Sequence, residues 1–177
     1  MPNRNRYFYN YKVLAENSIS DDNLTKALEF YKKAYKYMDE KKDVEMMLDM
    51  AIVYYELEMP EKAKEIYEEI LEFNIDEPRA YFGLGIIYED YQEFDKAILF
   101  FKKCIDIDPE YQKAYFFLAS VYYSLKDTDS TIQCYEKSLE LKPDDYWSLI
   151  NLGSIFEEEE EYERALNLFY RAKEINP

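Results

Sequence analysis

The residue types on which most enzymes depend are scarce in this chain of 177 residues. Because histidine is absent, Ser-His and Cys-His nucleophile pairs, histidine zinc ligands and the usual near-neutral general base are excluded. The two cysteines, Cys104 and Cys134, lie far apart in the sequence and cannot alone supply the four ligands of a structural zinc site. We therefore expect free, packed thiols, with no metal and no cofactor.

The three glycines do not form a nucleotide-binding loop. Gly83 and Gly85 read G-x-G, but residues 86–88 supply no third glycine and lie within a helical pattern. Carboxylate pairs are abundant among the 38 acidic residues, and none differs by its spacing from a solvated surface. We expect no catalytic residues; an enzyme that uses only Asp, Glu, Tyr or Lys is the alternative.

The charge balance limits the partners. With 22 basic and 38 acidic residues the net charge is −16, whereas nucleic acids and anionic membranes are bound by clusters of Lys and Arg. The longest uncharged stretch, Ala114 to Leu125, has 12 residues, which is too short to span a bilayer. The first residues contain no apolar run typical of a secretory signal. We expect a cytoplasmic protein with no nucleic-acid partner and no membrane insertion.

The sequence repeats itself every 34 residues. In one set of columns a leucine is followed by a small residue and then, three residues later, by an aromatic ring. In another set an alanine or threonine is followed four residues later by an aromatic ring. The first set is Leu84-Gly85-Tyr88, Leu118-Ala119-Tyr122 and Leu152-Gly153-Phe156; the second is Ala63-Tyr67, Ala97-Phe101, Thr131-Tyr135 and Ala165-Phe169. Such a period indicates a stacked repeat protein.

This spacing resembles the tetratricopeptide repeat family, whose unit is a helix, a tight turn and a second helix. The resemblance implies an all-α fold in which antiparallel helix pairs stack into one right-handed superhelical solenoid over residues 1–177. The five units are about 8–43, 44–77, 78–111, 112–145 and 146–177, and the first is longer by two residues near Asp39 to Asp43. Ser18 replaces an aromatic ring and Thr131 replaces an alanine, so packing there should differ.

Helical periodicity agrees with the resemblance. Tyr81, Leu84, Gly85 and Tyr88 fall on one stripe of a helix, and the small residues should allow two helix backbones to approach closely. Pro60 and Asn23 are expected to begin second helices, and Pro109, Pro143 and Pro177 are expected to close three successive units. Asp76 is expected to cap the helix that begins near Pro78.

By the same resemblance, the first helix of each unit lines a concave face. Apolar side chains there are not required by the helix-pair core, and an apolar patch rimmed by charge usually marks an interaction site. The acidic rim (Glu45, Asp49, Glu56, Glu89, Asp90, Glu157 and Glu158) favours a basic amphipathic helix or peptide as ligand. The predicted partner-binding residues are Leu48, Ile52, Tyr55, Arg79, Phe82, Ile86, Glu89, Lys113, Phe116, Ser120, Tyr123, Ile150 and Asn151.

One branch of the family binds acidic chaperone tails through a clamp of basic and amide side chains. Lys12 and Arg79 could occupy two places of such a clamp, but Glu16, Asp49 and Gly83 stand where it needs donors. We therefore expect no acidic-tail partner.

The predicted function is a non-catalytic adapter or scaffold that binds a protein or peptide. Two alternatives stay open: a structural protein that forms homo-oligomers through its C-terminal repeat, and a regulatory segment of a larger enzyme. The first alternative rests on Leu168, Phe169 and Ala172, which we expect to keep part of their surface uncovered at the end of the stack. Residues Met1 to Tyr11 are expected to fold over the other end.

Overall fold

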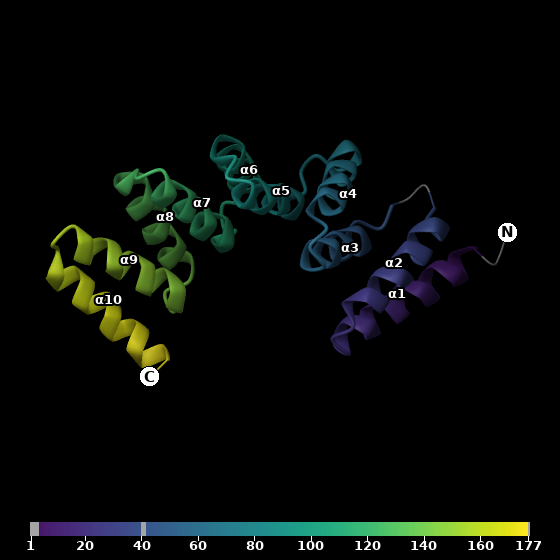
Figure 1. Ribbon diagram of the computed structural model, residues 1–177, viewed down its shortest axis with the longest axis horizontal. Helices are drawn as coiled ribbons and strands as arrows, with labels where there is room; N and C mark the ends of the chain where they lie inside the picture. Colours follow the sequence, from purple (N-terminus) through teal and green to yellow (C-terminus); the bar gives the residue numbers. More distant parts are fainter. Residues whose placement is uncertain (1–3, 40–41, 177) are drawn as a thin grey trace. The chain divides into compact units, whose positions relative to one another are not determined.

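The computed structural model describes residues 4–39 and 42–176, and within them it contains ten α-helices and no strand (Figure 1). The chain divides into unit 1 (Met1–Gly83) and unit 2 (Leu84–Pro177). Unit 1 contains α1 (Arg4–Ser20), α2 (Leu24–Tyr37), α3 (Val44–Glu56), α4 (Pro60–Phe73) and the start of α5 (Pro78–Asp90). Unit 2 contains the rest of α5, α6 (Phe94–Ile107), α7 (Gln112–Ser124), α8 (Thr128–Leu141), α9 (Tyr146–Glu158) and α10 (Tyr162–Ile175).

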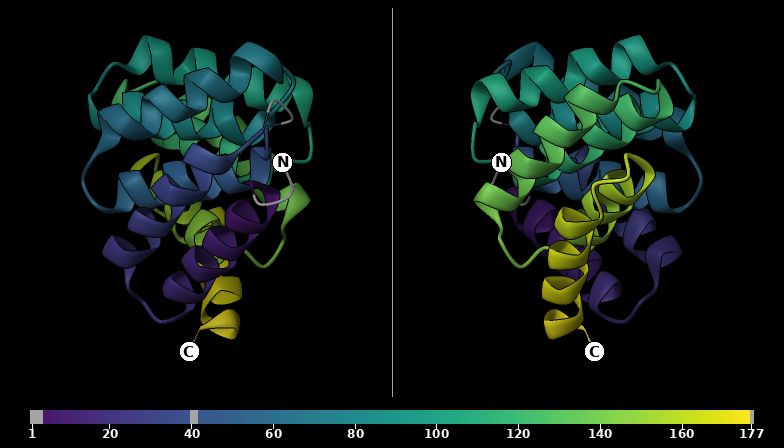
Figure 2. Two further views of the ribbon diagram at one scale, coloured as in Figure 1. Left: turned by 90° about the vertical axis from the view of Figure 1, so that its right-hand side faces the viewer. Right: turned by 90° about the vertical axis from the view of Figure 1, so that its left-hand side faces the viewer.

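Consecutive helices form antiparallel pairs, as the repeat spacing predicts. Helices α1 and α2, α3 and α4, α7 and α8, and α9 and α10 pack against each other along their lengths (Figures 1 and 2). In unit 2, α6 also packs on α7 and α8 on α9, so that second helices contact the first helix of the following pair. The predicted all-α architecture of helix pairs is confirmed.

The turns inside the pairs share one backbone geometry that the sequence did not reveal. Each has a non-glycine residue with φ between 57° and 62°, at Asp22, Glu58, Gln92, Lys126 and Glu160. The next N–H donates to a carbonyl five residues back, for example from Asp127 to Tyr122 at 3.0 Å. This is the bond pattern of a Schellman motif, which usually has glycine at its left-handed position. The repeat therefore keeps this conformation without glycine.

Close contact between paired helices depends on small residues. A methyl group added at Gly85 would lie 2.5 Å from a ring carbon of Phe101, and one added at Gly153 would lie 2.6 Å from a ring carbon of Phe169. Phe101 is fully buried and Ala97 beside it is equally inaccessible. The predicted role of small residues at the helix crossing is therefore confirmed.

Most expected helix starts are observed, with one correction. Helix α4 begins at Pro60, and the side chain of Asn23 caps α2 by accepting from the N–H of Lys26 at 3.0 Å. Helix α5 begins at Pro78, but the capping carboxylate belongs to Glu77 rather than to Asp76. Glu77 is nearly buried beside the helix terminus, where its side chain accepts from a backbone N–H, whereas Asp76 is exposed.

The two exceptional core positions are satisfied internally. The hydroxyl of Ser18 donates to the carbonyl of Leu14 at 2.8 Å, and that of Thr131 donates to the carbonyl of Asp127 at 2.7 Å. Both residues are buried. Each hydroxyl thus has a partner within its own helix or cap, so replacing the usual side chain leaves no unpaired polar atom.

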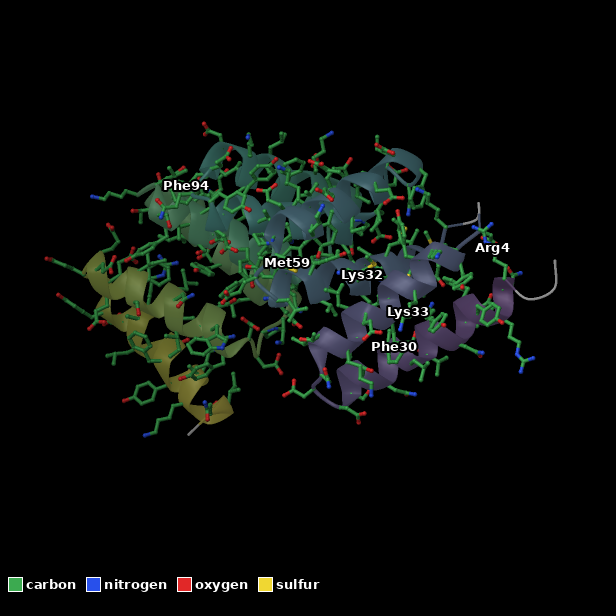
Figure 3. The ribbon with its side chains drawn as sticks, turned by 45° about the vertical axis from the view of Figure 1, so that its right-hand side comes forward. Arg4, Phe30, Lys32, Lys33, Met59 and Phe94 are labelled. Atoms are coloured by element: carbon green, nitrogen blue, oxygen red, sulfur yellow. The ribbon has the colours of Figure 1, made fainter. Side chains whose placement is uncertain are left out.

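Residues 4–11 are part of α1 rather than a separate segment folded over the end. Tyr11 stacks on the ring of Phe30, and the guanidinium of Arg4 donates to the carbonyl of Met38 at 2.8 Å. The amine of Lys33 lies 5.3 Å from the ring centre of Phe30, and Figure 3 labels both side chains. Residues 1–3, like Pro177, lie outside the described part of the chain.

A buried chain of hydrogen bonds connects α7, α8 and α9. The amide of Gln112 donates to Ser138 at 2.6 Å, and the Ser138 and Ser148 hydroxyls lie 2.8 Å apart. Because Ser148 donates to Asp145 at 2.8 Å, its oxygen must accept the proton of Ser138. The four groups form one directed series that ends on a carboxylate.

The two cysteines are free, as expected. Cys104 is buried in the α6 core, and burial raises the pKa of the Cys134 thiol to about 11.

The end of unit 2 differs from expectation. Leu168 and Ala172 are buried, because they face the α8 and α9 core, and Phe169 is only half-buried. The exposed large apolar side chains of α10 are instead Tyr162, Leu166, Tyr170 and Ile175.

Candidate protein-binding surface

In unit 2, eight of the predicted partner-binding residues lie on α5, α7 and α9, the first helices of their pairs. We call them the α5–α7–α9 surface. None of them is fully buried, so each retains some accessible area. The eight residues are Ile86, Glu89, Lys113, Phe116, Ser120, Tyr123, Ile150 and Asn151.

Glu89 is the most unusual group on this surface. Burial raises the pKa of its carboxyl group, and the neighbouring Asp90 acts in the same direction, whereas a hydrogen bond from Ser120 on α7 opposes them. A half-buried carboxylate has lost part of its hydration and gains more from an added cation than a solvated carboxylate does. Glu89 is therefore suited to accept an ammonium or guanidinium group.

Tyr135 of α8 supports the surface from below. The amide of Asn151 donates to its hydroxyl at 3.1 Å, and the ring of Phe116 packs edge-on with centres 5.6 Å apart. Tyr135 is buried and interacts electrostatically with Glu89, which helps to raise the pKa of its phenol. The repeat pattern marks Tyr135 only as a core ring, so sequence reasoning missed its polar role.

Tyr123 connects α7 to α9 at the edge of the surface. Its hydroxyl donates to the carboxylate of Glu158 at 3.1 Å, while its ring is 51% exposed. Lys113, at the start of α7, is exposed. The edge therefore offers an aromatic ring beside carboxylates from α9.

The predicted residues of unit 1 differ among themselves. Leu48 is only 4% exposed and offers almost no area to a partner, whereas Ile52 on the same helix is 46% exposed. Tyr55 and Phe82 are half-buried. The guanidinium of Arg79 contacts Glu45 through two bonds of 2.7 Å and Glu77 through another of 2.7 Å.

Both cations considered for an acidic-tail clamp are engaged by carboxylates. Besides the pairs of Arg79, the amine of Lys12 lies 2.7 Å from Asp43. Nearby, burial raises the pKa of Asp49, with Glu45 and Glu16 adding to the effect and a hydrogen bond from Tyr31 opposing it. A second negative group here would be repelled.

A hollow that the sequence did not indicate lies among α8, α9 and α10. Its volume is about 590 Å³, and its lining includes Leu139, Leu152, Phe156 and Leu168. The guanidinium of Arg164 lies 3.7 Å from the ring centre of Phe156 and contacts Glu136 at 3.0 Å. The charges at this hollow are therefore largely paired within the protein.

The described residues show neither a cluster of metal ligands nor a membrane-spanning helix. No group of three or more His, Cys, Asp or Glu side chains is placed to hold a metal ion in residues 4–39 and 42–176. In the same part of the chain no helix has both the length and the apolar character needed to cross a bilayer.

Comparison with known proteins agrees with the repeat spacing. Family models described as tetratricopeptide repeat match residues 18–84, 78–111, 113–145 and 134–167. No curated protein sequence matches closely enough to count as a relative.

Solved structures resemble the chain over nearly its whole length. A crystal structure of MamA is 25% identical with a TM-score of 0.77, covering 92% of this chain and 94% of MamA. MamA (residue 41 to the end) from Desulfovibrio magneticus RS-1 is 18% identical with a TM-score of 0.80, covering 96% and 94%. Pseudomonas aeruginosa pilF is 18% identical with a TM-score of 0.85, covering 98% of this chain and 78% of its own. Together with the helix pairs and the family models, which match most of its length, these likenesses establish that the chain belongs to the tetratricopeptide repeat family.

Proposed function

We propose that the protein is a non-catalytic adapter that binds a basic amphipathic helix or peptide on the α5–α7–α9 surface. The observation that carries this proposal is the half-buried carboxylate of Glu89, which accepts a hydrogen bond from Ser120 of α7 on that surface. A Lys or Arg of the ligand would pair with Glu89, and its apolar face would contact Ile86, Phe116 and Ile150.

The apolar and acidic parts have separate roles in this proposal. Burial of the half-exposed rings and aliphatic side chains supplies most of the affinity, at roughly 25 cal/mol per Å². Glu89, Asp90 and Glu158 supply the preference for a basic ligand and accelerate association at low salt. For unit 1 taken by itself, we propose that Ile52, Tyr55 and Phe82 offer apolar area to a partner and that Leu48 does not.

The test uses two synthetic 20-residue amphipathic helices with the same Leu face, one with Lys and one with Glu on the polar face. Isothermal titration should show binding of the Lys peptide and at least tenfold weaker binding of the Glu peptide. Glu89→Gln should lower the affinity for the Lys peptide by about five- to twentyfold, as expected for a partly desolvated ion pair. Glu72→Gln is the matched control, because Glu72 is an exposed carboxylate on α4, and it should change nothing.

The pH dependence separates Glu89 from a general charge effect. Because the folded pKa of Glu89 is raised, it takes up a proton at higher pH than an ordinary carboxyl group. Affinity for the Lys peptide should therefore fall as the pH is lowered from 7 toward 5, and the Glu89→Gln variant should lack most of this dependence. Asp90 and Tyr135 are the titratable groups that interact with Glu89. Equal affinity for both peptides, or equal effects of the two substitutions, would contradict the proposal.

A further inference from the structure

Helix α10 carries an apolar stripe that nothing covers in the described part of the chain. Tyr162, Leu166 and Tyr170 are spaced four residues apart and are 57%, 54% and 66% exposed. Such spacing places them along one side of a helix. The right-hand view of Figure 2 shows α10, in yellow, with no helix of unit 2 in front of it.

The corresponding face is covered elsewhere in the repeat. Ile98 and Ile132 stand 34-residue periods before Leu166, on α6 and α8, and both are half-buried where α7 and α9 pack on those helices. The ring of Phe169 is half-buried, whereas its counterpart Phe101 is fully buried. The part of this side around Leu166 is therefore covered in α6 and α8, whereas the counterparts of Tyr170, Lys102 and Glu136, are exposed.

The charges near the stripe make α10 complementary to itself in an antiparallel arrangement. The acidic run 157–161 precedes α10, and Lys173 lies near its other end, on the same side of the helix as Tyr162 and Leu166. Arg164 and Arg171 do not contribute there, because their guanidinium groups bind Glu136 and the carbonyl of Pro143.

A two-fold axis at Leu166 gives a simple register. Positions of α10 equally distant from 166 then meet, so Tyr162 faces Tyr170 of the second copy. Lys173 extends past the start of the partner's α10 and lies beside the acidic turn that contains Glu159 of the second copy. The antiparallel direction also sets the acidic start of each helix beside the basic end of the other, and it opposes their dipoles favourably. Helix α10 has 14 residues, so the contact would extend over about 21 Å.

We propose that α10 is a self-association surface, on which a second copy of this chain packs its own α10 in antiparallel orientation about Leu166. This inference is independent of peptide binding at Glu89, which lies on another helix. The pairing is isologous, so each copy contributes the same stripe and both Lys173–Glu159 pairs form.

Sedimentation equilibrium of the full chain, from about 5 to 500 μM, measures the association constant. We expect a reversible dimer, and Leu166→Glu should weaken it at least about 100-fold, because two carboxylates would be buried at the axis. The control Leu99→Glu alters a residue of α6 that is 53% exposed and lies away from the stripe, and it should leave the constant unchanged.

Charge exchange tests the register without disturbing the core. Lys173→Glu and Glu159→Lys should each weaken the dimer about three- to tenfold, and the double variant should restore most of the loss. Both side chains are exposed, so folding should not change, which far-UV circular dichroism would verify. Leu166→Cys should form an intermolecular disulfide under mild oxidation, whereas Leu99→Cys should not.

A wild-type chain that stays monomeric at the highest concentration would overturn the proposal. It would also be overturned by a dimer that survives Leu166→Glu, or by a double charge variant no tighter than the single ones. The affinity for the Lys peptide should be measured in the same variants. A variant that loses the dimer but keeps normal peptide affinity bears on self-association through α10 and not on peptide binding at Glu89.

Discussion

Replacing Gly85 by alanine tests how tightly the paired helices are packed. Gly85 lies within α5, where alanine would favour the helix by about 1 kcal/mol. Its new methyl group, however, would stand 2.5 Å from Cε1 and 2.6 Å from Cδ1 of Phe101. Because Phe101 is fully buried, its ring has no space into which to retreat. Overpacking of this kind costs about 1–3 kcal/mol, so we expect a net loss of up to about 2 kcal/mol.

Gly153→Ala is the matched comparison. Its methyl group would meet Cε1 of Phe169 at 2.6 Å, nearly the same distance, but Phe169 is only half-buried. That ring can turn outward, so the overpacking cost is smaller and the helix preference of alanine should dominate. We expect Gly153→Ala to range from neutral to about 1 kcal/mol more stable than wild type.

Urea unfolding followed by far-UV circular dichroism gives the free energies to compare. The slope of the unfolding free energy against urea concentration (the m value) should stay unchanged in both variants, because the surface exposed on unfolding does not change. Adding Phe101→Leu to Gly85→Ala should recover part of the loss, since the smaller side chain makes room for the methyl group. The reasoning would be refuted if Gly85→Ala stabilised the protein as much as Gly153→Ala does.

Other substitutions test single features of the structure. Lys126→Gly should stabilise the protein by about 0.5–1 kcal/mol in the same urea assay, because Lys126 has φ of 61°. Ser138→Ala and Ser148→Ala should each cost about 1–2 kcal/mol, and the double variant less than their sum, because both single variants break the same Ser138–Ser148 hydrogen bond. Asp49→Asn should stabilise the fold at pH 7, because burial raises the pKa of Asp49 and thus penalises its charged form. That gain should disappear as the pH falls below about 4, where wild-type Asp49 is protonated in both states.

The helix pairs could be predicted because their determinants recur. Leucine, small residue and aromatic ring stand at fixed offsets in several units, and the alternation of a helix with a tight turn follows from that spacing. The left-handed residues of the turns were harder to predict. Glycine is the usual signal of a left-handed residue, and positions such as Gln92 and Lys126 carry long polar side chains instead. No single-residue signal marks them; only their common spacing does.

The repeat positions of the candidate-site residues could be predicted from the sequence, but their solvent exposure could not. Leu48, Phe82, Phe116 and Ile150 occupy the same position of successive units, yet Leu48 is 4% exposed and the other three are half-buried. Accessible area depends on how large the neighbouring side chains are, and a repeat spacing contains no information on that.

The pKa of Glu89 also depends on neighbouring side chains that the repeat spacing does not reveal. Glu157 stands two 34-residue periods after it and is an ordinary exposed carboxylate, whereas Glu89 is half-buried against α7 and receives a hydrogen bond from Ser120. The two residues are the same amino acid at the same repeat position, and burial raises the pKa of Glu89. The cation preference that we propose for Glu89 depends on the side chains around it, so a substitution at Ser120 should change ligand preference as well as one at Glu89. Ser120→Ala removes the hydrogen bond that opposes burial, which should raise the pKa of Glu89 further and move the fall in Lys-peptide affinity to higher pH. An unchanged pH profile in isothermal titration of that variant would show that burial by α7, rather than the Ser120 hydroxyl, sets the protonation of Glu89.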